Sequence, residues 1–410
     1  MSQDIILITI DALRHDSVSR LEYTSEYFSE EQSGEAITSG AATNWVFPGI
    51  LSGTYYPEAY DENGLLRNEL VSLPEKLDGE GYDTAAFLGF NPYLSKWSER
   101  FETFWNGGVD DANEEWYNNG IEKWVSRAYR TALLKKRVSG EKVVKEAQDW
   151  YENGSGPQFL WIHLMEPHGP YYPGFSAGLD IGLVDTYRSV LNFQRMGDDA
   201  PQRDIDVQRA LYERCVERAD QRVKDILSFV NEDARIVVVG DHGEEFEHGH
   251  IDHERLYDEC VKVPYFQRNM EHTPQPESVR QIDIPAEILS TVDIDTPEDW
   301  NAKGFDTDDP AFMLTPWGEN GTFQYAIRTD SEKLIRTYDI DSGEVVEHEY
   351  YDLETDPGEK NNTYRSATID ELQRKLNGFI KKYEHALGIN PETGIDSELV
   401  EERLRNLGYK

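Results

Sequence analysis

An aspartate and a histidine directly follow one of the most apolar short segments of the chain. Residues 235–240 (Arg-Ile-Val-Val-Val-Gly) are β-branched and lack alternation, which is typical of a buried parallel strand. Asp241 and His242 come next, and Gly243 lets the backbone turn so that both side chains can face one point. Because open α/β sheets bind ligands at the carboxyl ends of their strands, the motif predicts a Zn²⁺, Mn²⁺ or Mg²⁺ site. The alternative is a polar turn that only ends the strand.

A second acid holds the same position near the N-terminus. Residues 4–10 form another apolar segment, and Asp11 follows it. Two strands far apart in the sequence that each bring an acid to the carboxyl edge of a sheet favour a divalent-metal site. The alternative role of Asp11 is that of a helix N-cap.

These two segments belong to a longer series of segments that occur in a set order along the chain. They are Ile8-Thr-Ile-Asp-Ala-Leu-Arg14, residues 73–85, Phe159-Leu-Trp-Ile-His-Leu-Met-Glu-Pro-His-Gly-Pro-Tyr171, residues 241–253 with 256–259 and 263–264, residues 326–330 with 333–335, and residues 351–362. Together they resemble the sulfatase branch of the alkaline-phosphatase superfamily over nearly the whole chain. The resemblance implies an α/β fold of the alkaline-phosphatase/sulfatase type and an enzyme that acts on anionic esters.

The family's nucleophile stands in a segment of the form nucleophile-x-Pro-Ser-Arg…Thr-Gly. Residues 43–53 align with that segment without a gap, which puts Thr43 at the nucleophile position. Sulfatases that use formylglycine need Cys or Ser there, followed by Pro and Arg, whereas this chain has Trp45 and Phe47 in those two places. Because the two cysteines, Cys215 and Cys260, lie elsewhere, the sequence argues against a formylglycine enzyme.

Thr43 has the chemistry for another route. Coordination to a divalent cation lowers the pKa of a hydroxyl and makes it a nucleophile, and the cation also offsets charge on a transferring phosphoryl group. At the start of a helix, Thr43 would also offer free backbone N–H groups to an anion. The alternative is that Thr43 only caps that helix.

The resemblance assigns the remaining site residues. It implies that Asp11, Thr43, Asp241 and His242 hold a divalent cation (Mg²⁺, Mn²⁺, Ca²⁺ or Zn²⁺). His168 would face the substrate anion, and His253 would contact that anion or a second metal. We expect His163 to be packed inside its strand. His248 and His250 could be ligands, but we expect both to lie in a solvated loop. Arg14 would pair with an acid near the metal or touch the substrate.

The organisation of the chain favours one catalytic unit with a smaller C-terminal part. Strand and helix patterns alternate from residue 4 to about residue 295, which predicts a mostly parallel sheet between helices. We expect this catalytic domain to span residues 1–310, with a polar, helix-rich insertion at 107–157. A long helix is predicted at 203–231, with Leu211, Cys215, Ala219 and Val223 in the core. Residues 311–410 should form an antiparallel subdomain, with strands between 324 and 353, a turn at 341–343 and an amphipathic helix at 369–387.

Charge and composition limit the cellular environments and partners that fit this chain. The 410 residues include 79 acids and 40 bases, for a net charge of −39, yet 38% are hydrophobic. Such a chain is typical of a folded protein from a salt-rich, halophilic cytoplasm, because salt screens the self-repulsion of its surface. Nucleic acid is excluded as a partner, since no basic stripe exists to meet phosphates. No signal-peptide pattern and no membrane-spanning run is found, so we expect a cytoplasmic protein.

The sequence therefore predicts a metal-dependent hydrolase or transferase of phosphate or sulfate esters that attacks through Thr43. Its partner would be a small anionic ester, with a glycan or a lipid headgroup as candidates. Two alternatives stay open. One is a sulfatase that works without formylglycine, and the other is a non-catalytic protein that binds an anionic glycan or headgroup.

Overall fold

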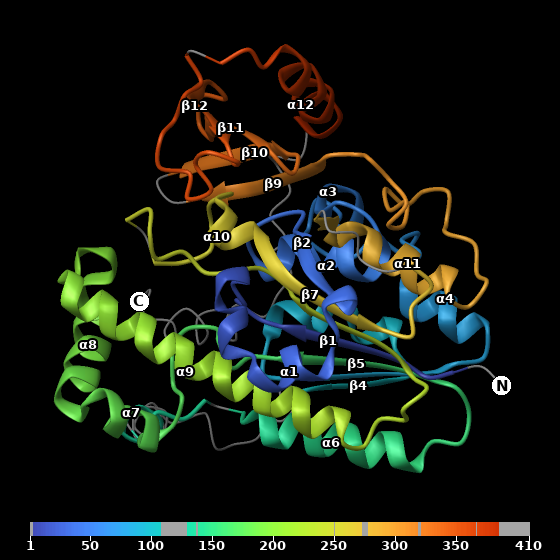
Figure 1. Cartoon of the computed structure of the whole chain (residues 1–410). Helices are drawn as coiled ribbons and strands as arrows, with labels where there is room; N and C mark the ends of the chain where they lie inside the picture. Colours follow the sequence, from blue (N-terminus) through green and yellow to red (C-terminus); the bar gives the residue numbers. More distant parts are fainter. Residues whose placement is uncertain are drawn as a thin grey trace.

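The protein is built around an eight-stranded sheet (Figure 1). The computed structural model describes residues 3–107, 129–136, 138–249, 251–272, 278–318, 321–365 and 367–384. Along the sheet the strand order is β4-β3-β5-β1-β6-β7-β2-β8. The strands are β1 (Ile5–Ile10), β2 (Ser33–Ile37), β3 (Asp83–Leu88), β4 (Thr103–Asn106), β5 (Gln158–Leu164), β6 (Arg235–Gly240), β7 (Lys262–Arg268) and β8 (Val279–Arg280).

The sheet is mostly parallel, as predicted. Strands β4, β3, β5, β1 and β6 run in one direction, and β7 is antiparallel to both of its neighbours, β6 and β2. Because the parallel strands share one direction, residues that follow β1, β3, β5 and β6 all emerge at the same edge. This edge carries the predicted site.

Helices cover both faces of the sheet (Figure 1). On one face lie α1 (Glu22–Tyr27), α6 (Gly140–Asn153) and α9 (Gln202–Leu227), and on the other lie α2 (Thr43–Ser52), α4 (Leu73–Gly79) and α11 (Ile284–Ser290). Alternate side chains of a strand point to opposite faces of the sheet. In β1 both sets are mostly apolar, so both faces of the sheet are hydrophobic there. Ile6, Ile8 and Ile10 of β1 join one core cluster, whereas Ile5 and Leu7 join the other.

Further helices complete this part of the chain. They are α3 (Tyr56–Ala59), α7 (Phe175–Ile181), α8 (Leu183–Met196) and α10 (Asp258–Val261), with 3-10 turns η1 (His15–Arg20), η2 (Glu30–Gln32), η3 (Pro92–Arg100), η6 (Gly197–Asp199) and η7 (Gln281–Asp283).

The long helix predicted at 203–231 is confirmed as α9, although it ends at Leu227, and the residues predicted for its core face are buried. Of the predicted insertion at 107–157, residues 108–128 and 137 lie outside the described residues. Residues 140–153 form α6, which lies between β4 and β5 in the chain. This helix packs on the sheet through Val143, Val144 and Ala147.

A smaller antiparallel sheet follows, with the order β12-β11-β10-β9. Its strands are β9 (Ala311–Gly318), β10 (Thr322–Arg328), β11 (Glu332–Asp339) and β12 (Val345–Asp352). The predicted turn at 341–343 joins β11 to β12, and Gly343 has a φ of 68° there. Helix α12 (Asp370–Tyr383) packs on this sheet as predicted, through Phe379 and Tyr383 against Tyr325. Residues 385–387 of the predicted helix lie outside the described residues.

Buried charges tie the small sheet to the larger one. Lys333 of β11 is fully buried, and its Nζ lies 2.8 Å from Asp258 Oδ1 and 2.7 Å from Glu359 Oε1. Arg328 of β10 also pairs with Asp258, at 2.9 Å. Since Asp258 begins α10, these ion pairs hold the small sheet against the segment that follows β6.

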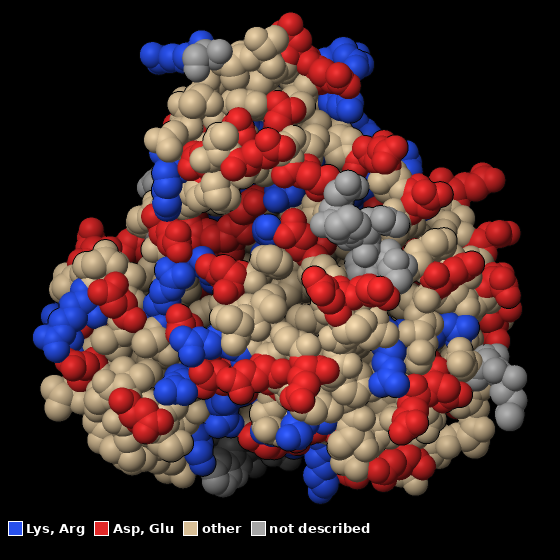
Figure 2. Space-filling model, viewed as in Figure 1, with Lys and Arg blue, Asp and Glu red and all other residues tan. Residues whose placement is uncertain are grey.

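The surface matches the acidic composition. Figure 2 shows Asp and Glu side chains spread over the visible face of both parts of the molecule, with Lys and Arg between them. Among the described residues, no helix is both long enough and apolar enough to cross a bilayer.

Candidate metal and nucleophile site

Two neighbouring strands deliver the acids of the site. In the register of β1 and β6, Ile10 lies opposite Gly240, so that Asp11 and Asp241 emerge side by side. Gly240 is required at this point because a Cβ there would lie 2.8 Å from the Leu13 carbonyl oxygen and 2.9 Å from Val263 Cβ. Gly243 is required for the same reason, since its Cβ would lie 2.0 Å from the Glu259 carbonyl oxygen.

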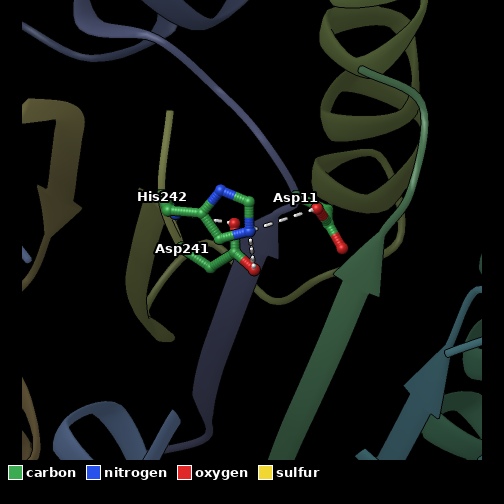
Figure 3. Close-up of side chains that lie close together, drawn as sticks. All are labelled: Asp11, Asp241 and His242. Carbon is green, nitrogen blue, oxygen red and sulfur yellow. Dashed lines mark hydrogen bonds and ion pairs between the residues drawn. The ribbon is translucent and has the colours of Figure 1, made fainter. Parts of the chain in front are cut away.

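Asp11, Asp241 and His242 form a fully buried cluster (Figure 3). Nε2 of His242 lies 3.6 Å from Asp11 Oδ1 and 3.7 Å from Asp241 Oδ2. Nδ1 of His242 bonds the Gly243 carbonyl at 2.8 Å, which leaves Nε2 as the ring atom that faces the acids. Asp241 Oδ1 accepts bonds from the backbone N–H groups of Ala12 (3.1 Å) and His242 (2.7 Å), so Oδ2 faces the cluster.

The electrostatics of this cluster suit a divalent cation. Burial and the adjacent Asp11 charge raise the pKa of Asp241 well above its ordinary value. Burial opposes ionisation of Asp11 too, but the His168, His163 and His242 imidazoles hold the pKa of Asp11 well below its ordinary value. Asp11 Oδ1 is buried, and none of the described residues donates a hydrogen bond to it. Two carboxylate oxygens and one imidazole nitrogen, all within 4.8 Å of one another, are donors that Zn²⁺, Mn²⁺ or Mg²⁺ accepts.

Thr43 lies directly beside this cluster. Its Oγ1 is 3.4 Å from Asp241 Oδ2 and 3.4 Å from His242 Nε2. Thr43 is the first residue of α2, and the N-cap position belongs to Ala42, which has no side-chain cap. The hydroxyl therefore faces the acids and does not cap the helix. Since the first turn of a helix has free N–H groups, the N-terminus of α2 also favours an anion here.

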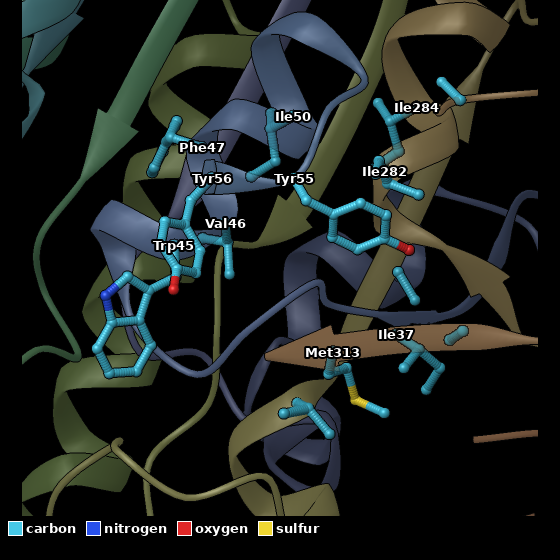
Figure 4. Packing of buried hydrophobic residues seen from close by; sticks show 14 of the residues in the cluster. Ile37, Trp45, Val46, Phe47, Ile50, Tyr55, Tyr56, Ile282, Ile284 and Met313 are labelled. Atoms are coloured by element: carbon cyan, nitrogen blue, oxygen red, sulfur yellow. The ribbon is translucent and has the colours of Figure 1, made fainter. Parts of the chain in front are cut away.

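Packing fixes the position of α2. Every residue from Thr43 to Ser52 is buried. Figure 4 shows α2 side chains, with Val46, Phe47 and Ile50 labelled, in a cluster that also includes Ile282 and Met313. The Phe47 ring packs with 5.1 Å between its centroid and that of Trp161 and 5.3 Å between its centroid and that of His163. The nucleophile candidate thus sits on a rigid, apolar helix.

Both histidines assigned to the substrate lie next to the cluster. His168 follows β5, and its Nε2 is 3.8 Å from Asp11 Oδ1. The His253 ring stacks on that of His242 with 4.3 Å between centroids, and lies 5.3 Å from the His168 ring. The structure therefore brings together Asp11, Thr43, His168, Asp241, His242 and His253.

Two side chains that contact Asp11 were not predicted from the sequence. His163 is buried as predicted, but its Nε2 also lies 3.3 Å from Asp11 Oδ2. Trp161 Nε1 donates to Thr9 Oγ1 (2.9 Å), which lies 2.8 Å from His163 Nδ1. Because the Asp11 carboxylate accepts, Nε2 is the His163 atom that donates to it. Asn91 Nδ2 lies 3.4 Å from the same oxygen. The available signal for Asn91 was its place just after β3, at the same sheet edge.

The prediction of a solvated His248 is wrong. The side chain of His248 is only 13% exposed, because it pairs with Glu259 and stacks on Tyr257 at 3.9 Å. His250 lies outside the described residues. For Arg14, the structure shows ion pairs with Asp16 (2.6 Å) and Glu259 (2.7 Å) and a hydrogen bond to the Glu244 carbonyl (2.7 Å).

The sheet is mostly parallel, and its carboxyl edge carries acids, imidazoles and the hydroxyl of the residue that begins α2. This arrangement is that of an α/β protein of the alkaline-phosphatase type. The family model for sulfatases matches residues 3–294, and the chain belongs to the sulfatase family. An N-acetylglucosamine-6-O-sulfatase of Bacteroides thetaiotaomicron is 26% identical over an alignment of 153 residues, and the match covers 32% of this chain. That match spans about a quarter (26%) of the relative's own length.

Solved structures share the fold over nearly the whole chain. A protein solved with its substrate D-glucosamine-2-N,6-O-disulfate superimposes with a TM-score of 0.67 at 15% identity, covering 97% of this chain and 100% of that one. A phosphonate monoester hydrolase of Agrobacterium radiobacter gives a TM-score of 0.62 at 15% identity, covering 94% and 95% of the two chains.

Proposed function

We propose that this protein is a metal-dependent hydrolase or transferase of phosphate or sulfate esters in which Thr43 attacks the substrate. The observation that carries this proposal is the position of Thr43 Oγ1, 3.4 Å from both Asp241 Oδ2 and His242 Nε2. In this proposal Asp11, Thr43, Asp241 and His242 hold the cation, and His168 and His253 steady the substrate anion. Membership of the sulfatase family and the named relatives, which are sulfatases and a phosphonate monoester hydrolase, support ester hydrolysis.

The residues divide the reaction into two displacements. Thr43 Oγ1 forms a bond to the phosphorus or sulfur atom while the bond to the ester oxygen breaks, and the leaving alcohol takes up the proton that the Thr43 hydroxyl loses. Water then cleaves the ester on Thr43 and restores the hydroxyl, whereas an acceptor alcohol in place of water would complete a transfer. When bound, a divalent cation supplies Lewis acidity that lowers the pKa of the hydroxyl and offsets anionic charge.

Because Thr43 has a single hydroxyl, we expect the protein to turn over phosphate esters faster than sulfate esters. A formylglycine hydrate has a second hydroxyl that expels sulfate by elimination, whereas an ester on Thr43 must be cleaved by water or passed on. We expect turnover of aryl phosphate or phosphodiester to exceed that of aryl sulfate by at least about tenfold, or roughly 1.4 kcal/mol.

The test compares aryl phosphate, aryl phosphodiester and aryl sulfate in molar KCl with Mg²⁺, Mn²⁺, Ca²⁺ or Zn²⁺ added singly. Equal or faster turnover of aryl sulfate would favour a second candidate function, that of a sulfatase that works without formylglycine. That candidate is favoured by the N-acetylglucosamine-6-O-sulfatase and by the fold relative solved with a disulfated glucosamine. Absence of turnover with every ester and metal would leave binding of an anionic glycan or lipid headgroup as the function.

We also propose a salt-rich cytoplasm as the working environment. The support is the net charge of −39 and the two cysteines, which are both buried free thiols. A protein with many acidic side chains gains most from salt, because screening weakens the repulsion between them.

A further inference from the structure

A fully buried glutamine lies directly against the turn that carries Asp241. Gln281 belongs to η7, and its side chain is withdrawn from water. Its Nε2 donates two hydrogen bonds of 2.8 Å, one to the Gly240 carbonyl oxygen and one to the Asp241 carbonyl oxygen. Because both of these neighbours are acceptors, the nitrogen of the amide and not its oxygen faces the turn. Gln281 therefore contacts the site through its two N–H groups.

The two carbonyl groups belong to the peptides on either side of the Asp241 Cα atom. The N–H groups of the same two peptides are also bound. Asp241 N–H donates to the Ile10 carbonyl (3.1 Å), and His242 N–H donates to Asp241 Oδ1 (2.7 Å). With these four hydrogen bonds, the backbone at Asp241 is held in one conformation. Since the rotamer of a side chain depends on its backbone, the same bonds set the direction of the Asp241 carboxylate.

The segment that carries Gln281 also packs on the nucleophile helix. Ile282 is the next residue of η7, and a Cβ added to Gly49 of α2 would lie 3.6 Å from the Ile282 Cα atom. Figure 4 shows Ile282 in the same apolar cluster as Ile50 of α2. The short η7 segment thus contacts α2, which begins at Thr43, and at the same time the turn that begins at Asp241.

We propose that Gln281 is a positioning residue that keeps the Asp241 carboxylate next to Thr43. Thr43 Oγ1 lies 3.4 Å from Asp241 Oδ2, and η7 links the elements from which these two atoms come. Without the two N–H groups of Gln281, the peptides at Asp241 can rotate and Oδ2 moves away from Thr43. This inference rests on the proposed function, because it explains the separation on which attack by Thr43 depends. In this role Gln281 acts through the Asp241 backbone.

The competing role of Gln281 is structural only. Its two hydrogen bonds satisfy buried carbonyl oxygens, and the loss of such bonds destabilises a protein wherever they occur. Gln324 on β10 offers a matched case, because its side chain is buried and also binds the backbone, through the Leu256 N–H at 3.0 Å. A structural role predicts the same kind of loss for both glutamines. A positioning role predicts that only Gln281 affects the site.

The experiment replaces each glutamine by methionine, which has a similar length and no N–H group. Gln281 Oε1 receives no hydrogen bond from the described residues, so Gln281→Met removes only the two bonds to the turn. Turnover of an aryl phosphate and Mn²⁺ affinity are measured on the full chain in molar KCl. We expect Gln281→Met to lower kcat and Mn²⁺ affinity by about ten- to a hundredfold each, the usual cost of losing a group that orients a ligand. Gln324→Met should lower the thermal midpoint but change neither quantity.

A crystal structure of Gln281→Met tests the geometry without relying on activity or metal. An Asp241 carboxylate displaced from Thr43 relative to wild-type crystals supports the inference, and an unmoved carboxylate overturns it. If Gln281→Met fails to fold, Gln281→Asn, which keeps the amide but shortens its reach, replaces it in every measurement.

The outcomes separate this inference from the proposed function. Wild-type kcat and Mn²⁺ affinity in Gln281→Met, or equal losses of both in Gln324→Met, would overturn the positioning role and leave the proposed function intact. A wild type that neither binds Mn²⁺ nor turns over any ester would overturn the proposed function. The crystal structure of the variant would then decide alone whether Gln281 sets the position of Asp241.

Discussion

Single polar residues at the sheet edge acquire their roles from their immediate neighbours. Threonine often caps helices, but Ala42 occupies the N-cap position of α2, so Thr43 lies one residue inside the helix. Its hydroxyl is therefore free to approach Asp241 and His242. In the same way, the Gly243 carbonyl sets the orientation of the His242 ring and turns Nε2 toward the acids.

Replacing the hydroxyl tests its proposed role. We expect Thr43→Ala to lower kcat by at least about a thousandfold, because a covalent nucleophile is lost, while the thermal midpoint and the bound metal change little. Thr43→Ser keeps a hydroxyl and should retain measurable turnover. Steady-state kinetics on an aryl phosphate would check both variants. A Thr43→Ala enzyme that kept more than about a tenth of the wild-type rate would rule out attack by Thr43.

The register between neighbouring strands determines which side chains contact the acids of the site. The register of β1 and β5 puts Thr9 opposite His163, two residues before Asp11. From that position His163 reaches Asp11 Oδ2, and the hydrogen-bond chain from Trp161 through Thr9 orients its ring. His163 thus supports a proposed ligand from the adjacent strand.

Removing this support should weaken the proposed metal site at Asp11, Asp241 and His242 without abolishing it. We expect His163→Phe to lower Mn²⁺ affinity at that site by about ten- to a hundredfold, the usual cost of losing a group that orients a ligand. Isothermal titration would measure the change, with His348→Phe, which lies on β12 of the small sheet, as a matched control. Unchanged affinity in His163→Phe would show that Asp11 does not depend on this hydrogen bond.

The segment from β6 to α10 depends on one buried acid. Glu259 pairs with Arg14 and His248, and its Oε2 accepts the Phe246 N–H at 2.8 Å. Burial opposes its ionisation, but the His248, Phe246 and Arg14 hydrogen bonds lower the pKa of Glu259 to about 2. A lowered pKa means that this acid stabilises the fold above its unfolded pKa of about 4.5, and that the contribution is lost as the pH falls toward 2.

Glu259→Gln should therefore destabilise the protein in a pH-dependent way. At pH 7 we expect a loss on the order of 2–3 kcal/mol in the free energy of unfolding, and this difference should shrink between about pH 4.5 and pH 2. Urea unfolding in molar KCl at a series of pH values measures it. Glu247→Gln, an exposed acid nearby, should cost little at any pH. A penalty for Glu259→Gln that did not vary with pH would contradict the assignment.

At the scale of the whole molecule, the surface carries a large excess of acids. The 79 acidic side chains face 40 basic ones, and Figure 2 shows the acids dispersed over the visible face. Repulsion between exposed charges is long-ranged in dilute buffer, since the Debye length is about 10 Å at 0.1 M salt and about 3 Å at 1 M. The fold should therefore be most stable in concentrated salt.

Thermal unfolding at different KCl concentrations tests this expectation. We expect the midpoint to rise by at least about 5 °C between 0.1 M and 2 M KCl, because screening relieves the repulsion in the folded state. Circular dichroism would follow the transition. A midpoint that stays constant or falls with KCl would show that the acidic surface does not strain the fold.

The sequence by itself determined the sheet and the principal acids of the site. Apolar runs of six or seven residues define β1, β5 and β6, and the shared direction of parallel strands places Asp11, His168 and Asp241 at one edge. The β6 motif with His242, and the alignment of residues 43–53 with the family's nucleophile segment, predicted the rest of the first cluster. These features depend on residues close together in the chain, which a local pattern can reveal.

Only the tertiary structure decided which distant side chains meet. His163 reaches Asp11 through a register between strands that are 152 residues apart, and no local pattern encodes that register. His248 lies in a polar stretch that resembles a solvated loop, yet Glu259, Tyr257 and the small sheet bury it. Glu244 and Asp252 are two acids among 79, and only the path of the chain after β6 turns them both toward His253. Burial and charge pairing depend on neighbours from several elements at once, and such neighbours are set by packing.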